Sequence, residues 1–151
     1  MTRSYAAPQG EPETPTRDRL SPTRRTHQEE GPDVRLDGKV AIITGGASGM
    51  GRVAGTMFAR EGARVVLADV SEEAAESAAA EVRAAGGDAT AVAADVSRED
   101  DARRMVEQAV ATYGRVDCLY NNAGIMPAAD HSVVDTDVDT WDRVMAVNVR
   151  G

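Results

Sequence analysis

Apolar residues gather in four short runs along the chain, and these runs alternate with stretches in which apolar positions follow a helical spacing. The runs are KVAIIT at 39–44, ARVVLAD at 63–69, ATAVAAD at 89–95 and VDCLYNN at 116–122. Nearly continuous apolar runs of this length are typical of strands that are covered on both faces, as in a parallel sheet. We therefore predict four parallel strands.

Helices are predicted between these strands. The segment 71–87 has Ser71 as an N-cap, acidic residues in its first turn and two glycines at its end. In the next helix, acidic residues 99–101 are expected to form the first turn after a cap at Ser97, and not a metal site. One face of that helix is apolar and carries Ala102, Met105, Val106, Ala109, Val110 and Tyr113. The resulting order is βαβαβαβα, which defines an α/β fold.

The first 34 residues differ from the rest of the chain. They hold five of the six prolines and few large apolar side chains, so residues 1–34 are predicted to be a disordered tail and residues 35–151 a partial domain. No apolar run follows Arg3 as it would in a signal peptide, and no stretch reaches the roughly 18 apolar residues of a membrane span. A membrane partner is therefore not expected.

The charge and the cysteine content of the chain indicate which partners and which cellular compartment to expect. Residues 35–151 carry 12 basic and 19 acidic side chains, a net charge of −7, which argues against a nucleic-acid surface. Cys118 is the single cysteine, so an internal disulfide is excluded and a reducing, cytoplasmic setting fits best. We expect Cys118 to fill a buried strand as a small apolar group.

The glycine-rich segment TGGASGMG at 44–51 lies between the first predicted strand and a helix that begins near Met50. Gly45 would permit a sharp turn, Gly49 would let the backbone approach a pyrophosphate, and Gly51 would let the helix pack close to the sheet. Together with Ser48, this segment is predicted to hold phosphates at a helix N-terminus. A plain flexible turn is the alternative interpretation.

Asp69 ends the second predicted strand, eighteen residues after Gly51. A carboxylate at this position is placed to bind the two ribose hydroxyls of an adenosine, and it would repel a 2′-phosphate. The sequence therefore favours NAD over NADP as the cofactor. Alternatively, Asp69 only begins the turn before Ser71.

Five motifs together resemble the classical short-chain dehydrogenase/reductase family. They are TGGASGMG, Asp69 at a strand end, DV at 95–96, NNAG at 121–124 and WDRVMAVNVRG at 141–151, and the resemblance extends over residues 36–151. It implies a Rossmann-type, doubly wound parallel sheet, of which this chain would hold about four strands. It also implies NAD-dependent interconversion of an alcohol and a carbonyl compound, and a homo-oligomer in the complete protein.

The resemblance also implies roles for individual residues. Asp95 and Val96 would flank the adenine, whereas Asn122 would tie the fourth strand to its neighbour. Ala123 and Gly124 would pass close to the nicotinamide ribose. Asn148 would be the asparagine of the catalytic set, which holds a water molecule in a proton relay. Four apolar positions near it are expected to contact the core or a partner: Trp141, Val144, Met145 and Val147.

The remaining catalytic groups of the family, a Ser and a Tyr followed four residues later by Lys, lie beyond the asparagine helix. Lys39 is the only lysine of the chain, and no tyrosine precedes it by four residues. The 151 residues alone are therefore expected to be inactive and to represent the cofactor half of a dehydrogenase. A non-catalytic NAD-binding module and a decayed gene fragment are the alternatives.

Overall fold

The computed structural model describes residues 35–128, 132 and 134–151, so the predicted tail at 1–34 lies outside the described residues. The predicted alternation of strands and helices is confirmed. In chain order the elements are β1 (Val40–Thr44), α1 (Gly49–Arg60), β2 (Arg64–Asp69), α2 (Glu72–Ala84), β3 (Asp88–Ala93), α3 (Glu99–Tyr113), β4 (Cys118–Tyr120), α4 (Val138–Met145) and the π-helical turn η1 (Ala146–Arg150).

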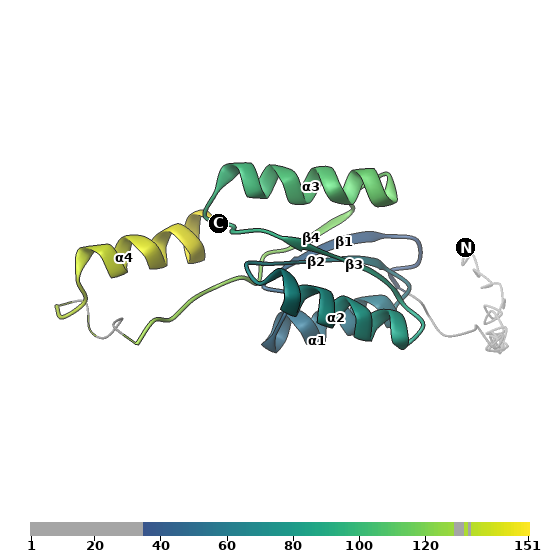
Figure 1. The fold of residues 1–151 in the computed structure, drawn as a ribbon, viewed down its shortest axis with the longest axis horizontal. Helices are drawn as coiled ribbons and strands as arrows, with labels where there is room; N and C mark the ends of the chain where they lie inside the picture. The colour runs from purple at the N-terminus through teal and green to yellow at the C-terminus, as the bar shows by residue number, and fades with distance from the viewer. Residues whose placement is uncertain (1–34, 129–131, 133) are drawn as a thin grey trace, which may run out of the picture. The chain divides into compact units, whose positions relative to one another are not determined.

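The four strands form one parallel sheet in the order β3-β2-β1-β4. Helices α1 and α2 lie on one face of the sheet and α3 lies on the other (Figure 1). The chain proceeds outward from β1 to β3 and then crosses to the opposite side of β1 to form β4. This reversal is the doubly wound arrangement, and such sheets bind ligands beside the carboxyl ends of the strands where the order reverses.

Alternate residues of β1 and β2 supply two apolar layers, one on each face of the sheet. Ile43, Val65 and Leu67 belong to the layer on the α1–α2 side, together with Ala78 and Ala79 of α2, while Ile42 and Val66 belong to the layer beneath α3. Each of the five strand side chains is fully buried, which stabilises the fold by about 1.5–3 kcal/mol per residue. The central strands are thereby fixed, and the loops that leave their carboxyl ends are held at one edge of the sheet.

Side-chain contacts at the helix ends agree with the prediction for α2 and correct it for α3. Ser71 caps α2, because its hydroxyl accepts a hydrogen bond from the Ala74 amide at 3.4 Å. Ser97 does not cap α3, whose N-cap is Arg98. The reason is competition: the hydroxyl and the amide of Ser97 both donate to Asp95 Oδ1, at 2.6 and 2.9 Å. The acidic first turn of α3 is present as predicted.

The fourth strand is shorter and more exposed than predicted. It spans three residues, pairs with β1, and leaves Leu119 48% and Tyr120 36% exposed. Cys118 is half-buried, so the prediction of a strand covered on both faces is wrong here. The physical reason is that β4 is the edge strand of the described sheet, with no further described strand beyond it.

Helix α4 extends past the carboxyl ends of the strands and does not lie over the sheet (Figure 1). Neither α4 nor η1 contains a buried residue, and Trp141 is 48% exposed. The expected core contacts of Trp141, Val144, Met145 and Val147 are therefore absent from the described structure, because no sheet face lies beneath this helix. A contact between these side chains and a partner stays a prediction.

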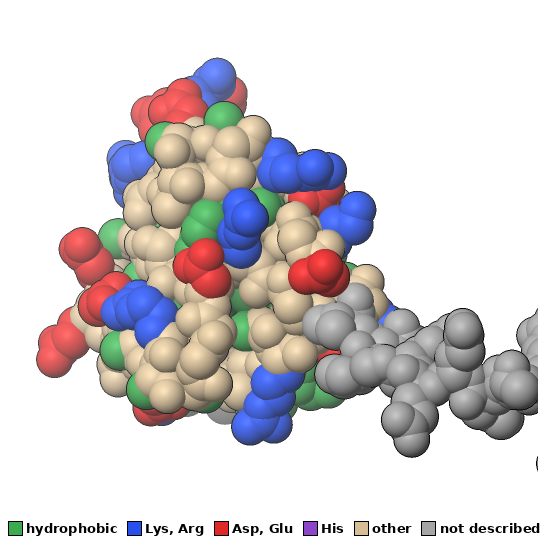
Figure 2. Space-filling model, turned by 90° about the vertical axis from the view of Figure 1, so that its right-hand side faces the viewer, with side chains coloured by type: hydrophobic (Ala, Val, Ile, Leu, Met, Phe, Trp, Pro, Cys, Tyr) green, Lys and Arg blue, Asp and Glu red, His purple; other side chains and the backbone are tan. Residues whose placement is uncertain are grey.

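Charged side chains of both signs are mixed on the surface. On the end of the molecule shown in Figure 2, arginines lie close to carboxylates among uncharged residues. Elsewhere in the described structure, ion pairs join Arg103 with Glu99 at 3.0 Å and Arg104 with Asp101 at 3.1 Å, both in the first turns of α3. Among the helices of the described ranges, none combines the length and the apolar character that crossing a membrane requires.

Candidate functional site

A crevice of about 510 Å³ lies beside the carboxyl ends of the strands and is closed on one side by α4 and η1. Ten of the eleven residues predicted to bind the cofactor line it: Gly45, Ser48, Gly49, Met50, Asp69, Asp95, Val96, Asn122, Ala123 and Gly124. The crevice also has walls that were not predicted: Val70, Ala94, Ser97, Ile125, Arg143, Ala146 and Val147. Gly51 and Asn148 were also predicted as site residues, but they do not line the crevice. They contact segments that do.

The glycine segment is closely packed at Gly45 and has open space beside Gly49. Gly45 and Gly49 both have positive φ angles, of 64° and 50°, which residues other than glycine adopt only with strain. A Cβ atom on Gly45 would lie 3.0 Å from the Cα atom of Ala123. A Cβ atom on Gly49 would meet no atom within 4 Å, so the space beside Gly49 is free for a ligand.

Gly51 lies beneath the loop and does not line the crevice. A Cβ atom there would come within 2.1 Å of the Gly45 carbonyl oxygen and 2.7 Å of Asn122 Nδ2. The glycine that brings α1 close to the buried sheet is Gly55, whose Cβ would lie 2.8 Å from a methyl group of Leu67. Sequence reasoning missed Gly55, although its position one helical turn after Gly51 was a usable signal.

The N-terminus of α1 presents backbone donors to the crevice. Ser48 is the N-cap, yet its side chain makes no capping hydrogen bond. The first amide groups of a helix have no acceptor within the helix, and they concentrate partial positive charge at that end. Because Ser48, Gly49 and Met50 line the crevice, this end of α1 suits an anion.

Asp69 lines the crevice and also forms hydrogen bonds with the glycine segment and with the turn before α2. Its Oδ2 atom accepts a hydrogen bond from the Ala47 amide at 3.1 Å, and its Oδ1 atom accepts one from the Ser71 amide at 3.2 Å. The carboxylate thus begins the turn before α2, as the alternative interpretation held, and also holds the glycine segment. Each oxygen retains acceptor capacity for a ligand hydroxyl.

The loop after β3 is positioned by the first turn of α3. The Asp95 amide donates to Asp101 Oδ2 at 3.0 Å. This hydrogen bond, followed by the charges of Arg104 and Arg98, lowers the pKa of the Asp101 carboxyl. An ionised Asp101 therefore holds Asp95 and Val96 at the crevice.

The end of β1 is joined to the end of β4 through Thr44 and Asn122. Thr44 is 2% exposed, and its hydroxyl oxygen accepts hydrogen bonds from the amides of Asn122 and Ala123, both at 3.0 Å. In return, Asn122 Nδ2 donates to the carbonyl oxygens of Thr44 and Gly45, at 3.0 and 3.3 Å. The predicted tie by Asn122 is present. Thr44 was missed, although a hydroxyl at the end of an apolar strand was its signal.

Asn148 joins η1 to the loop that follows β4. Its Oδ1 atom accepts from the Ile125 amide at 2.8 Å, and its Nδ2 atom donates to the Ile125 carbonyl oxygen at 2.9 Å. Both ends of the side-chain amide are therefore used on one backbone unit. This pair holds the π-helical turn at the crevice, and the role of Asn148 in holding a water molecule stays a prediction.

Known proteins resemble this chain over almost all of the described region. The short chain dehydrogenase family matches residues 39–151. "Tropinone reductase-like 1" from Erythroxylum coca is 44% identical over 123 residues, which cover 80% of this chain and 44% of that protein. "Secoisolariciresinol dehydrogenase" from Forsythia intermedia is 41% identical over 118 residues, covering 78% of this chain and 42% of that protein.

A bacterial relative shows the same degree of similarity. An "Uncharacterized oxidoreductase" from Thermotoga maritima is 41% identical over 118 residues, which cover 78% of this chain and 45% of that protein. This chain therefore spans less than half the length of each of these three relatives. The family match includes every element from β1 to η1 and all residues of the crevice. The chain belongs to the short chain dehydrogenase family.

Proposed function

We propose that the crevice binds NAD and that the protein is an NAD-dependent oxidoreductase that interconverts an alcohol and a carbonyl compound. One observation carries the proposal. The glycine segment, the N-terminus of α1 and the carboxylate of Asp69 face the same crevice, at the point where the strand order reverses. Relatives whose names describe a reductase and a dehydrogenase support the same class of reaction.

The chemical groups along the crevice fit the parts of a dinucleotide. The open space at Gly49 and the amides at the start of α1 suit a diphosphate. The free acceptor capacity of Asp69 suits the hydroxyls of the adenosine ribose, and Asp95 with Val96 would flank the adenine. We assign the nicotinamide ribose to Ala123 and Gly124, whose small side chains permit close approach.

The residues of this chain would bind and orient the cofactor. A bound nicotinamide supplies the hydride acceptor or donor of the reaction. Proton transfer to or from the substrate oxygen requires an acid–base group, and the family's Tyr-x-x-x-Lys pair is not among these 151 residues. We therefore assign cofactor recognition to this chain and expect it to show no alcohol oxidation by itself.

Preference for NAD over NADP rests on Asp69. The carboxylate is held by two backbone amides, so it has little freedom to turn away from a ligand. A 2′-phosphate on the adenosine ribose would bring a second negative charge close to it, with an unfavourable Coulomb energy. NAD carries two hydroxyl donors at the same place and would meet no such repulsion.

Calorimetric titration of the chain with NAD and with NADP tests the proposal. We expect NAD to bind at least about tenfold more tightly, which is the effect of a charge-assisted contact. Asp69→Asn retains an acceptor oxygen but removes the charge, so the ratio of the two dissociation constants should approach one. An unmodified chain that binds NADP as tightly as NAD would contradict the cofactor assignment, and absence of binding would contradict the proposed function.

A further inference from the structure

Arg143 is the one basic side chain among the described residues that line the crevice. The charges around it are otherwise acidic, because Asp69 and Asp95 are the remaining ionisable lining residues. Arg143 lies on α4, and it shares a helical face with Ala146 and Val147, which also line the crevice. The α4–η1 segment therefore brings a cation to a wall of the crevice that the sequence motifs did not predict.

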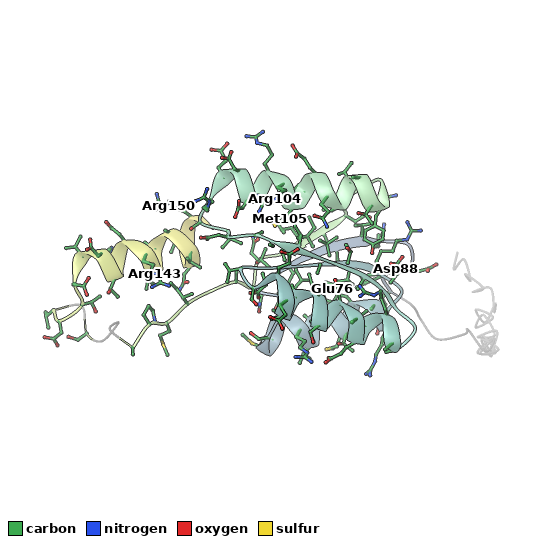
Figure 3. The ribbon with its side chains drawn as sticks, in the orientation of Figure 1. Glu76, Asp88, Arg104, Met105, Arg143 and Arg150 are labelled. Atoms are coloured by element: carbon green, nitrogen blue, oxygen red, sulfur yellow. The ribbon has the colours of Figure 1, made fainter. Side chains whose placement is uncertain are left out.

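The guanidinium of Arg143 forms no ion pair or side-chain hydrogen bond within the described part of the chain. Most arginines there do: Arg35, Arg52, Arg83, Arg98, Arg103, Arg104 and Arg115 are each paired with a carboxylate. Figure 3 shows Arg143 on α4, next to the loop that leads from β4. Its five N–H donors are thus available to a ligand in the crevice.

The position of α4 is held at the end nearest the crevice. Asn148 bonds twice to the Ile125 backbone, and a Cβ atom on Gly151 would lie 2.6 Å from a methyl group of Val96. The segment that carries Arg143 is therefore seated between the loops that follow β3 and β4. A guanidinium presented from a seated helix loses less side-chain freedom on binding than one on an unsupported loop.

The ligand chemistry follows from the charges. A dinucleotide brings two negative charges on its diphosphate into a crevice that already contains two carboxylates. The partial positive charge at the N-terminus of α1 offsets only part of this negative charge, since a helix end is equivalent to about half a unit charge. A guanidinium matches phosphate oxygens in charge and in planar, bidentate geometry.

We infer that Arg143 binds a phosphate group of the dinucleotide from the side opposite the glycine segment. The inference rests on the proposed function, since it assumes that the crevice holds a dinucleotide. Arg143 would then be a cofactor-binding residue contributed by α4, in addition to the motif residues at the strand ends. It would close the crevice over the diphosphate and compensate the charge of Asp69 and Asp95.

The test compares ligands that differ in their phosphate groups. Adenosine, ADP and NAD are titrated calorimetrically into the unmodified chain and into Arg143→Gln, Arg143→Lys and Arg150→Gln. Arg150 is the matched control, because it lies on the same helical segment without lining the crevice (Figure 3). Thermal unfolding of each variant verifies that the fold is retained.

We expect Arg143→Gln to weaken ADP and NAD binding about tenfold, as for one charge-assisted contact, and to leave adenosine binding unchanged. Arg143→Lys should cause a smaller loss, because the charge is kept and the bidentate geometry is not. Arg150→Gln should bind all three ligands normally. Raising the salt concentration should reduce the difference between unmodified chain and Arg143→Gln.

Three outcomes would overturn the inference. Unchanged NAD and ADP affinity in Arg143→Gln would show that Arg143 makes no phosphate contact, while the proposed function would stand. An equal loss for adenosine would place the arginine on the nucleoside instead. If the unmodified chain binds neither ADP nor NAD, the proposed function fails, and the inference fails with it.

Discussion

Replacing Gly51 with alanine places one methyl group at the most crowded glycine of the site. The new Cβ atom would lie 2.1 Å from the Gly45 carbonyl oxygen and 2.8 Å from its carbonyl carbon, well inside van der Waals contact. Because those atoms belong to the backbone, no side-chain rotation relieves the clash. The loop must move by about 1 Å, since carbon and oxygen atoms in contact are normally separated by a little over 3 Å.

The cost of this movement follows from the contacts it disturbs. Overpacking of this kind costs about 1–3 kcal/mol. The shift of the Gly45 carbonyl also breaks the 3.3 Å bond from Asn122 Nδ2, which is worth about 1 kcal/mol. Alanine recovers about 1 kcal/mol through its higher helix propensity. We therefore expect Gly51→Ala to lower the free energy of unfolding by about 1–3 kcal/mol and to displace the loop from its ligand-binding geometry.

Gly55→Ala provides the matched control on the same helix. Its Cβ atom would meet a methyl group of Leu67 at 2.8 Å, and a side chain can yield where a backbone cannot. The gain in helix propensity offsets much of this contact, so we expect a change below about 1 kcal/mol. Urea unfolding followed by circular dichroism measures both variants, and calorimetry measures NAD affinity. If Gly51→Ala were no less stable than Gly55→Ala and bound NAD normally, the packing argument would be refuted.

Two further substitutions test the structural support of the site. Thr44→Val removes the hydroxyl that accepts two amide hydrogen bonds, so it should lower the free energy of unfolding by about 2–4 kcal/mol in urea unfolding, whereas Thr44→Ser should be nearly neutral. The hydrogen bond from the Val40 amide, and then Arg115, hold the pKa of Asp117 below its ordinary value. Its stabilisation is therefore present above about pH 4 and lost as pH falls through the lowered pKa. Asp117→Asn should be less stable at pH 7, and the difference should shrink at acidic pH; a constant difference would contradict the assignment.

Local patterns predicted the elements well because each one depends on neighbouring residues. The run Val40–Thr44 is β-branched and apolar, and it became the fully buried strand β1. Ser71 precedes two glutamates and caps α2, because only its amide donates to Asp69 and its hydroxyl remains free to accept from the Ala74 amide. Ser97 has the same local signal, but the adjacent Asp95 carboxylate takes its hydrogen bonds, so the cap moves to Arg98.

Contacts between distant segments were harder to predict. The bonds from Thr44 to Asn122 span 78 residues, and the pair formed by Asn148 and Ile125 spans 23. These contacts depend on the strand order and on the path of α4, which no local pattern specifies. The π-helical turn that contains Asn148 was not predicted either. It coincides with the contact between Asn148 and Ile125, which is a contact between distant segments.

Arg143 illustrates how placement changes the interpretation of a residue. In the sequence it is one arginine on an amphipathic helix, where a charged residue normally faces solvent. The apolar residues of the same helix were expected to determine its packing, yet none of them is buried. What places Arg143 at the crevice is the extension of α4 beyond the sheet (Figure 1), a property of the fold and not of the helix.

A crystal structure of this chain with NAD tests the central claim most directly. The account predicts that the diphosphate lies beside Gly49 and the N-terminus of α1, within hydrogen-bond distance of the first helical amides. It also predicts that both hydroxyls of the adenosine ribose contact the carboxylate of Asp69. Electron density for the dinucleotide outside the crevice, or a diphosphate remote from the glycine segment, would contradict the account.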